Sequence, residues 1–388
     1  MVVVDSPEGA AEEVAAVAAE PVGAHYPDPI PIIKRRDLTL LATVGIPIAS
    51  LGVLIVLGLW FESLGSIAIW AGLLALIPLG IVLWGALWID RWEPEPKRML
   101  TFAFLWGAGF SALIGVFVGA EPDQFEEIIA GAGTFIVTAI QAPIIEETAK
   151  GFVVLLMFLL VRRRFDGPVD GIVYATWSAA GFAFVENILY FGNEIANPSG
   201  DVASIFIVRG LMSPFAHVMF TAVCGAIVGI AARKGATWWQ GIGAWLLGLI
   251  PAIGLHALWN GALFVVTDFV SYYALFQLPL FVAMVLVVMA LRREERRITL
   301  TRLLEFEEAG WFAPGEAAIL ATSEGRQRMR RWARASGHAR MMDRYIRMAT
   351  NLAFARQREH LGRDPEVARH EEREALDRIQ QLRLQMRA

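Results

Sequence analysis

The sequence predicts an all-helical, polytopic integral membrane protein with about eight transmembrane helices and a C-terminal cytosolic helical domain. Hydrophobic residues make up 56% of the 388 residues and charged residues only 19%. The mean hydropathy of +0.51 is typical of proteins that cross a membrane several times. The formal net charge of −4 averages very unlike regions, so by itself it excludes no class of partner.

Residues 1–33 are rich in Ala, Glu and Pro and offer little to bury, which predicts a disordered acidic N-terminal tail. We expect no cleavable signal peptide, because no basic region followed by a short apolar core is present. Lys34, Arg35 and Arg36 then precede the first long apolar run.

The core at 34–291 contains eight apolar stretches of about 20 or more residues, enough to cross roughly 30 Å of hydrocarbon. They extend over about 38–61, 64–89, 99–120, 132–161, 169–191, 202–231, 239–266 and 269–291.

Basic residues support this count, because they fall on alternate connections: Lys34–Arg36, Arg91 with Lys97–Arg98, Arg162–Arg164, Arg233–Lys234 and Arg292–Arg297. The other connections, such as Glu121–Glu127 and Gly192–Asp201, lack Lys and Arg. By the positive-inside rule we expect a multi-pass protein of the cell membrane with both termini in the cytoplasm.

The fourth stretch carries Glu146, Glu147 and Lys150. A central Asp, Lys or Arg costs roughly 2.5–3.5 kcal/mol in a membrane helix, whereas each apolar neighbour offsets only about 0.3–0.6 kcal/mol. Either carboxylate can meet the ammonium on one helix face, at spacings of four and three residues. One ion pair needs only one carboxylate, so we favour a functional site facing a polar interior over a structural pair.

Further polar residues lie in the next three stretches. Glu186 and Asn187 end the aromatic-rich run Phe182–Asn187, and Arg209, Pro214, His217 and Thr221 follow in the sixth stretch. His256 and Asn260 share one face of the seventh. Counting along the helices places these groups around one cavity in the middle-to-outer half of the bilayer.

Carboxylates and imidazoles around a cavity have three uses. A glutamate activates water for hydrolysis while His, Asn or a metal stabilises the oxyanion. Two histidines and a carboxylate also form a known zinc set, although the HExxH spacing is absent. The second use is proton-coupled transport, with a non-catalytic scaffold built on the same cluster as a related alternative. The third use is haem ligation by His217 and His256.

Outside this cluster, Cys224 is the only cysteine, which excludes an intramolecular disulfide and indicates a small apolar packing residue. Residues 292–388 are rich in Arg, Glu, Ala, Leu and Met and predict the cytosolic helical domain, with breaks near Pro314–Gly315, Gly337 and Gly362–Pro365. Its last stretch, Glu366–Met386, predicts a solvated charged helix, with partner binding or self-association as the alternative.

These motifs together resemble the PrsW family of intramembrane proteases, which is distantly similar to the type II CAAX prenyl endopeptidases. Four stretches within about 40–290 carry the resemblance: Asp90–Pro96 (DRWEPEP), Glu146–Lys150 (EETAK), Phe182–Asn187, and the helices with His217 and His256–Asn260. The resemblance implies peptide-bond hydrolysis in or beside the membrane, with anti-sigma factors as the associated substrates. It also implies a catalytic core of Glu146, Glu147 and His217, supported by Glu186 and His256. A metalloprotease mechanism and a glutamate-dependent one both stay open.

We therefore expect Glu146 or Glu147 to activate water, with His217, His256 and Glu147 as ligands of any divalent metal such as zinc. Asn187 and Asn260 would orient groups and Lys150 would tune the carboxylates. The expected partners are the lipid bilayer and a membrane protein or peptide substrate, and we expect no nucleic-acid partner. The Asp90–Pro96 loop, made stiff by its prolines, reads as a structural or docking segment.

Overall fold

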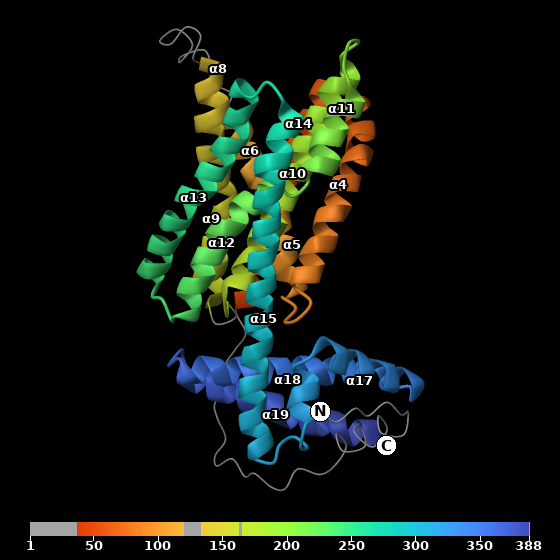
Figure 1. Ribbon diagram of the computed structural model, residues 1–388, viewed down its shortest axis with the longest axis vertical. Coiled ribbons are helices and arrows are strands. Elements are labelled where there is room, and N and C mark those ends of the chain that lie inside the picture. Colours follow the sequence, from red (N-terminus) through yellow and green to blue (C-terminus); the bar gives the residue numbers. More distant parts are fainter. Residues whose placement is uncertain (1–36, 120–132, 163–164, 388) are drawn as a thin grey trace. The chain divides into compact units, whose positions relative to one another are not determined.

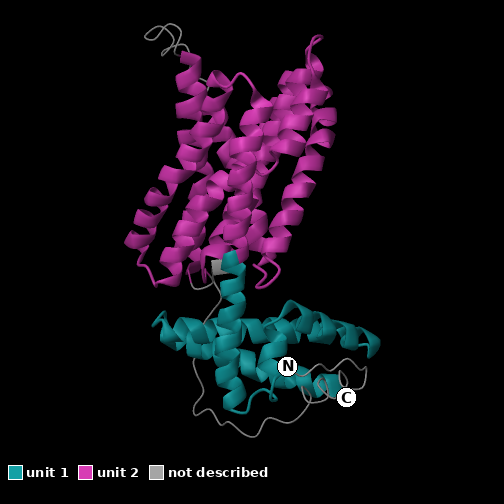
Figure 2. Ribbon diagram, viewed as in Figure 1, with its two compact units in different colours: residues 1–34, 290–388 teal, residues 35–289 magenta. Residues whose placement is uncertain are grey.

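The computed structural model describes residues 37–119, 133–162 and 165–387, and every regular element in these ranges is a helix (Figure 1). The acidic tail at 1–33, the basic residues Lys34–Arg36, and the connection at Glu121–Glu127 lie outside the described residues. The chain divides into two compact units, which we call the first and second unit in chain order. The first is residues 35–289, drawn in magenta and keyed unit 2 in Figure 2, and the second contains the described residues from Ala290 onward, drawn in teal and keyed unit 1.

The first unit is built from long helices, several of which contain a π-helical turn (η) continuous with the α-helix on either side. In chain order its elements are α2 (Asp37–Leu40), η1 (Leu41–Gly45), α3 (Ile46–Leu64), α4 (Ile67–Ile89), α5 (Lys97–Trp106), η2 (Gly107–Ser111), α6 (Ala112–Gly119), α8 (Gly133–Ile136), η3 (Val137–Gln141), α9 (Ala142–Val161), α10 (Pro168–Ala196), α11 (Val202–Phe206), η5 (Ile207–Met212), α12 (Ala216–Arg233), α13 (Trp238–Val265), α14 (Phe269–Tyr272), η6 (Tyr273–Gln277) and the start of α15 (Leu278–Glu308).

Among the described residues, seven helices are long and apolar enough to cross a membrane: Leu41–Leu64, Ile67–Ile89, Lys97–Phe117, Pro168–Ala196, Val202–Arg233, Trp238–Val265 and Phe269–Glu308. They coincide with seven of the eight predicted spans and confirm the polytopic fold class. The helix at the remaining predicted span, α8–η3–α9, carries Glu146, Glu147 and Lys150 and is not one of the seven, so its crossing stays a prediction. The eighth predicted span, at 269–291, is the apolar part of a longer helix, which continues to Glu308 because Arg, Glu and Leu are good helix formers.

Helix α10 is the central element of the first unit. In its most apolar 18-residue stretch 78% of the residues are buried inside the protein, whereas the corresponding stretch of Phe269–Glu308 is only 6% buried. Helix α10 packs against α4, α5, α9 and α12. The contact with α12 is close because two glycines meet there: a Cβ on Gly171 would lie 1.9 Å from the carbonyl oxygen of Gly225. Such proximity holds the polar side chains of α10 and α12 within reach of α9.

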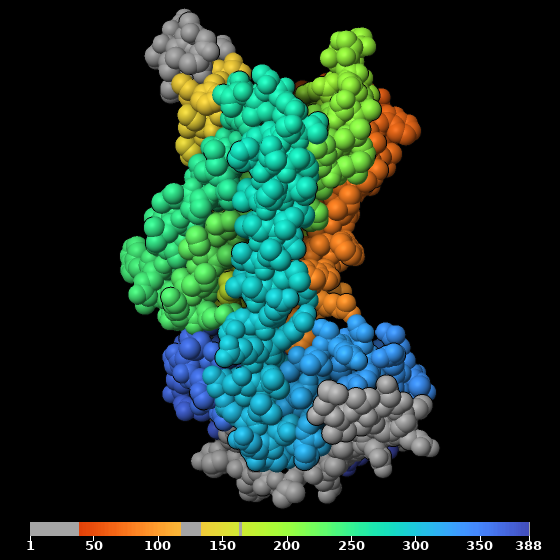
Figure 3. Space-filling view, in the orientation of Figure 1, coloured from red at the N-terminus to blue at the C-terminus, as the bar shows by residue number. Residues whose placement is uncertain are grey.

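The periphery of the first unit is apolar, as expected of a surface that contacts lipid. Helices α13 and α15 form much of the face seen in Figure 3. Helix α13 exposes Leu246, Leu247, Ile250 and Leu258 on one side, while His256 on another side is buried. The polar cluster therefore faces the interior of the bundle.

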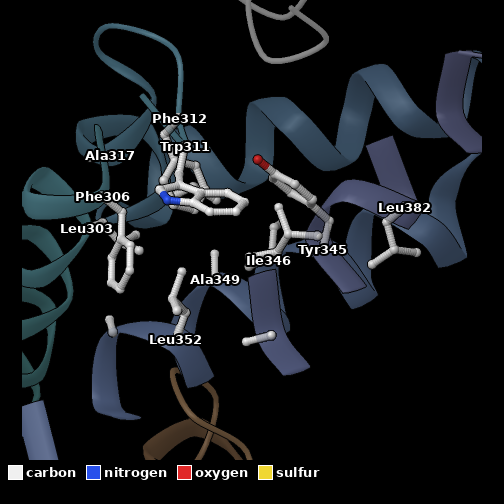
Figure 4. Close-up of a cluster of buried hydrophobic side chains, with 14 of the residues drawn as sticks. Leu303, Phe306, Trp311, Phe312, Ala317, Tyr345, Ile346, Ala349, Leu352 and Leu382 are labelled. Carbon is white, nitrogen blue, oxygen red and sulfur yellow. The ribbon is translucent and has the colours of Figure 1, made fainter. Parts of the chain in front are cut away.

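The second unit contains the end of α15 with α16 (Glu316–Leu320), α17 (Ser323–Ala335), α18 (Ala339–His360) and α19 (Pro365–Arg387). Its core gathers Leu303, Phe306, Trp311, Phe312, Tyr345 and Leu382 (Figure 4). The predicted breaks near Pro314–Gly315, Gly337 and Gly362–Pro365 are confirmed, since each lies between two of these helices. The predicted helix at Glu366–Met386 is also confirmed as α19.

Candidate active site

The first turns of α9 place Glu146, Glu147 and Lys150 inside the bundle. The helix begins with Pro143 in its first turn, where the missing N–H is not needed, and it continues directly from the π-helical turn η3. Neighbouring helices bind its backbone in the same region: the Trp106 indole N–H donates to the carbonyl of Ala149 at 2.9 Å, and the Ser178 hydroxyl donates to that of Lys150 at 3.0 Å. These bonds fix the rotation of α9 at the level of the charged residues.

Glu147 is fully buried, and three side chains bind its carboxylate. Its Oε1 atom lies 2.7 Å from Nζ of Lys150 and 2.9 Å from Nδ1 of His256. Its Oε2 atom accepts a hydrogen bond of 2.7 Å from the Thr221 hydroxyl. Because both oxygens are occupied by groups from α9, α12 and α13, Glu147 is suited to positioning its neighbours.

Glu146 has a more open environment than its neighbour. Its side chain is 14% exposed, and its Oε2 atom lies 3.3 Å from Nζ of Lys150. The same oxygen lies 3.9 Å from Nε2 of His256, beyond hydrogen-bond range. Of the two adjacent carboxylates, Glu146 is therefore the one with room for a water molecule or a substrate group.

Lys150 is fully buried and its ammonium determines the tautomer of His217. Nζ of Lys150 lies 3.0 Å from Nδ1 of His217, and an ammonium can only donate, so Nδ1 accepts. The ring proton of a neutral His217 is then on Nε2, which donates to Oε2 of Glu186 at 3.0 Å. The ammonium also lies 4.3 Å from the centre of the Phe182 ring, a favourable cation–π distance.

Glu186 and Asn187 are joined by Arg209, which the π-helical turn η5 carries. One Nη atom of Arg209 donates to Glu186, and Nε donates to Oδ1 of Asn187 at 2.9 Å. The guanidinium also stacks over the Tyr190 ring, 3.8 Å from its centre. Arg209, Asn187 and His217 line a small pocket that Pro214 and Trp259 complete.

His256 contacts Glu147 through Nδ1 and Phe220 through the face of its ring. The ring stacks on Phe220 with centroids 4.9 Å apart and lies 5.1 Å from the His217 ring. Asn260, one turn later, has a different position: its amide donates to the carbonyl of Thr138 at 2.9 Å. Asn260 therefore binds the η3 turn that precedes α9.

The predicted residues Glu146, Glu147, Lys150, Glu186, His217 and His256 thus form one connected network, with Asn187 joined through Arg209. The sequence alone predicts no role for Thr221 or Arg209, although both lie among the polar residues of the sixth stretch. A detectable signal existed for both: Thr221 lies four residues after His217 on one helix face, and Arg209 is a charge in an apolar span with no acidic residue on its own helix.

The donor set fits a metal ion. Glu146, His217 and His256 each offer a ligand atom, and these atoms all lie within 4.8 Å of one another. Two imidazoles and one carboxylate are a ligand set of catalytic zinc sites, and a metal-binding His commonly donates its other N–H to a carboxylate, as His256 would to Glu147. The carboxylate in this candidate metal site is Glu146, whereas the predicted metal ligand was Glu147.

Comparison with known proteins shows the family of the chain. The family model described as PrsW family intramembrane metalloprotease matches residues 95–289, which include every residue of the network.

The chain is 33% identical over 156 residues to Protease PrsW of Clostridioides difficile (strain 630), covering 39% of this chain and 62% of that protein. It is 30% identical over 196 residues to Protease PrsW of Geobacillus kaustophilus (strain HTA426), covering 49% of this chain and 78% of the relative. Protease PrsW of Bacillus subtilis (strain 168) is 26% identical over 192 residues, with 47% and 78% covered. No solved structure gives a significant match. The chain belongs to the PrsW family of intramembrane metalloproteases.

Proposed function

We propose that this protein hydrolyses a peptide bond of a membrane-protein substrate in or beside the bilayer, and that Glu146 is the carboxylate that acts on water. The observation that carries the proposal is the difference between the paired glutamates. Glu147 is enclosed by Lys150, His256 and Thr221, whereas Glu146 is partly open and lies near the same His256.

In the proposed reaction, Glu146 takes a proton from water as the water oxygen attacks the scissile carbonyl carbon. The proton passes to the leaving nitrogen when the carbon–nitrogen bond of the tetrahedral intermediate breaks. Asn187 is a candidate oxyanion donor, because its oxygen is used by Arg209 while its amide N–H groups stay available beside the pocket. Glu147, Lys150 and Thr221 hold His256, His217 and Glu146 in place.

In the metal-dependent alternative, a divalent metal such as zinc bound to Glu146, His217 and His256 would supply a polarised water and a Lewis acid for the carbonyl oxygen, and Glu146 would serve as a ligand in place of its role as the base. Lys150 has a role in this arrangement too, because its ammonium occupies Nδ1 of His217. If Nδ1 of His217 were the ligand atom, the ammonium would compete with the metal, and Lys150 would adjust the metal affinity of the site.

The substrate class follows from the location of the site. The residues of the network come from helices in the apolar core, so the scissile bond has to enter or border the bilayer. A single-span membrane protein of the anti-sigma-factor kind is consistent with the family resemblance. The basic connections further support a cytoplasmic location for both termini.

The experiment uses the full chain in liposomes with a single-span reporter tagged at both ends. We expect new peptide termini with the unchanged protein and a fall in rate of roughly 10²–10⁴-fold for Glu146→Gln. Glu62→Gln, an exposed glutamate of α3, is the matched control and should be fully active. Chelation and metal analysis of the same preparation separate the two mechanisms. Cleavage by Glu146→Gln at the normal rate, or reporter-dependent proton flux without new termini, would overturn the proposal.

A further inference from the structure

The second unit carries a strongly basic surface that the proposed protease function does not use. Residues 324–347 contain eight arginines and only two acidic residues. Six of the arginines are exposed: Arg328, Arg331 and Arg334 on α17, and Arg340, Arg344 and Arg347 on α18. We call these six side chains the arginine face.

The two halves of the arginine face adjoin. Helices α17 and α18 pack against each other, and Arg330 bonds Asp343 across them at 2.8 Å. Arg340, Arg344 and Arg347 follow intervals of four and three residues, which places them on one side of α18. Within the described part of the chain, none of the six exposed arginines has an ion pair or a side-chain hydrogen bond. Their donors are therefore available to a ligand rich in carboxylates.

The chain itself contains a segment of matching charge. Residues 1–33 hold six acidic residues and no Lys or Arg: Asp5, Glu8, Glu12, Glu13, Glu20 and Asp28. Because an arginine fork matches a carboxylate with two parallel hydrogen bonds, such a segment suits the arginine face. The 24 residues from Glu13 to Asp37 allow a covalent reach of up to about 80 Å. Attachment to the same chain also gives the segment a high effective concentration.

An anionic membrane surface fits the same face less well. Helices that lie in a bilayer interface insert an apolar side, and their basic residues contact the headgroups. The apolar side of α17 is already used, since Met329 and Ala333 are fully buried in the core of the second unit. We propose that the acidic N-terminal segment, residues 1–33, binds the arginine face of α17 and α18 in the same molecule. Bound in this way, it also denies the face to any other acidic partner.

Intramolecular cross-linking of the full chain tests the proposal. Ala11→Cys and Ala335→Cys add thiols beside the two surfaces without changing a charge, and the native Cys224 is buried. With a short bifunctional maleimide in detergent, we expect a cross-link within one molecule. Replacing Arg331, Arg334 and Arg344 by Gln should reduce its yield roughly tenfold, since each exposed charge pair contributes up to several-fold. High salt should have the same effect.

The control changes the same kind of residue elsewhere. Arg378→Gln with Arg387→Gln, both exposed on α19, should leave the yield unchanged. Charge reversal gives a second check: Glu12→Lys with Glu13→Lys should abolish the cross-link, and adding Arg331→Glu with Arg334→Glu should restore it. A yield insensitive to salt and to the arginine changes would overturn the proposal. So would a cross-link found only between two molecules, or Ala335→Cys protected only by anionic lipid nanodiscs.

Discussion

Nδ1 of His256 lies 2.9 Å from Oε1 of Glu147, so the bond between them ties α13 to α9 at the centre of the site. A carboxylate at Nδ1 holds the ring proton there and leaves the lone pair on Nε2. That nitrogen is the one near Glu146, at 3.9 Å from its Oε2 atom. The adjacent glutamates thus serve opposite sides of one imidazole, and this division of roles leads to the first prediction.

Glu147→Gln should impair the site although Glu147 is not expected to touch the water. An amide at this position presents N–H groups to Lys150 or to His256, both of which donate in the present network. We expect cleavage of the reporter to fall roughly 10²-fold, and any metal affinity to fall about 10–100-fold. Thr221→Val removes only one hydrogen bond to Glu147 and should lower the rate much less. Equal rates for the Glu147→Gln and Thr221→Val variants would contradict the assignment.

Lys150→Met should destabilise the folded protein. The ammonium is fully buried between Glu146 and Glu147, and removing one partner of a buried ion pair costs roughly 3–5 kcal/mol. The midpoint of thermal unfolding in detergent measures the effect, with Lys234→Met as the control at a helix end. Combining Lys150→Met with Glu147→Gln should cost less than the sum of the two single changes, because the buried charges are then removed together. A Lys150→Met variant as stable as the Lys234→Met control would argue against a neutralising role.

Sequence reasoning located the helices and the polar cluster for one physical reason: charge is expensive in an apolar helix, so Glu146, Lys150, Glu186 and Arg209 stand out. It did not reveal the partners of each group. Contacts between helices, such as Thr221 with Glu147 or Asn260 with the η3 turn, follow from helix rotation and packing, which leave no periodic signal. Hydropathy marks the end of a span and not the end of a helix, so the apolar stretch at 269–291 did not reveal that its helix continues to Glu308.

Arg209→Gln tests whether the guanidinium positions Glu186 and Asn187. The variant loses the bond to Glu186 and the stacking on Tyr190, so Glu186 is free to move away from His217. We expect kcat to fall about tenfold or more with a smaller change in KM, as for an interaction that orders the catalytic groups. Arg209→Lys should not restore the rate, because a lysine lacks the fork that reaches both partners. Full rescue by lysine would show that only the charge matters.

The short turn between α4 and α5 should make stability depend on pH. Burial raises the pKa of Asp90 to about 7 from its ordinary value of 3.8, against the opposing hydrogen bond from the Glu95 N–H. Burial, followed by the nearby Asp170 carboxylate, also raises the pKa of Glu95. A raised folded-state pKa means that the folded protein holds the proton more tightly, so the stabilisation is complete below the unfolded value and is lost as pH rises through about 7.

Asp90→Asn stays neutral and should therefore flatten the decline in unfolding temperature between mildly acidic and mildly alkaline pH. The asparagine oxygen can still accept the Glu95 N–H bond, which is 3.0 Å long in the native turn. Asp268→Asn is the control, because Asp268 is fully exposed and its hydrogen bonds with Ser271 lower its pKa. Parallel pH profiles for Asp90→Asn and the unchanged protein would exclude Asp90 as the titrating group.

Arg383→Met should unfold the second unit selectively. Arg383 donates to Glu316 at 2.7 Å, to the Tyr345 hydroxyl at 2.8 Å and to the carbonyl of Trp311 at 2.7 Å. Trp311 and Tyr345 belong to the hydrophobic core labelled in Figure 4. Its removal leaves the Glu316 carboxylate buried without a cation, at a cost of roughly 3–5 kcal/mol.

Burial raises the pKa of Glu316 even in the presence of Arg383. Without the arginine, Glu316 takes up a proton more readily, so the Arg383→Met variant should recover stability as pH falls and lose it as pH rises through the folded-state value. Proteolysis of a C-terminally tagged full chain at two pH values measures this, with the exposed Arg387→Met as the control. Because a methionine fills most of the volume of the arginine stem, lost packing alone predicts equal protease sensitivity at both pH values. A larger loss at the higher pH therefore identifies the unpaired carboxylate as the cause.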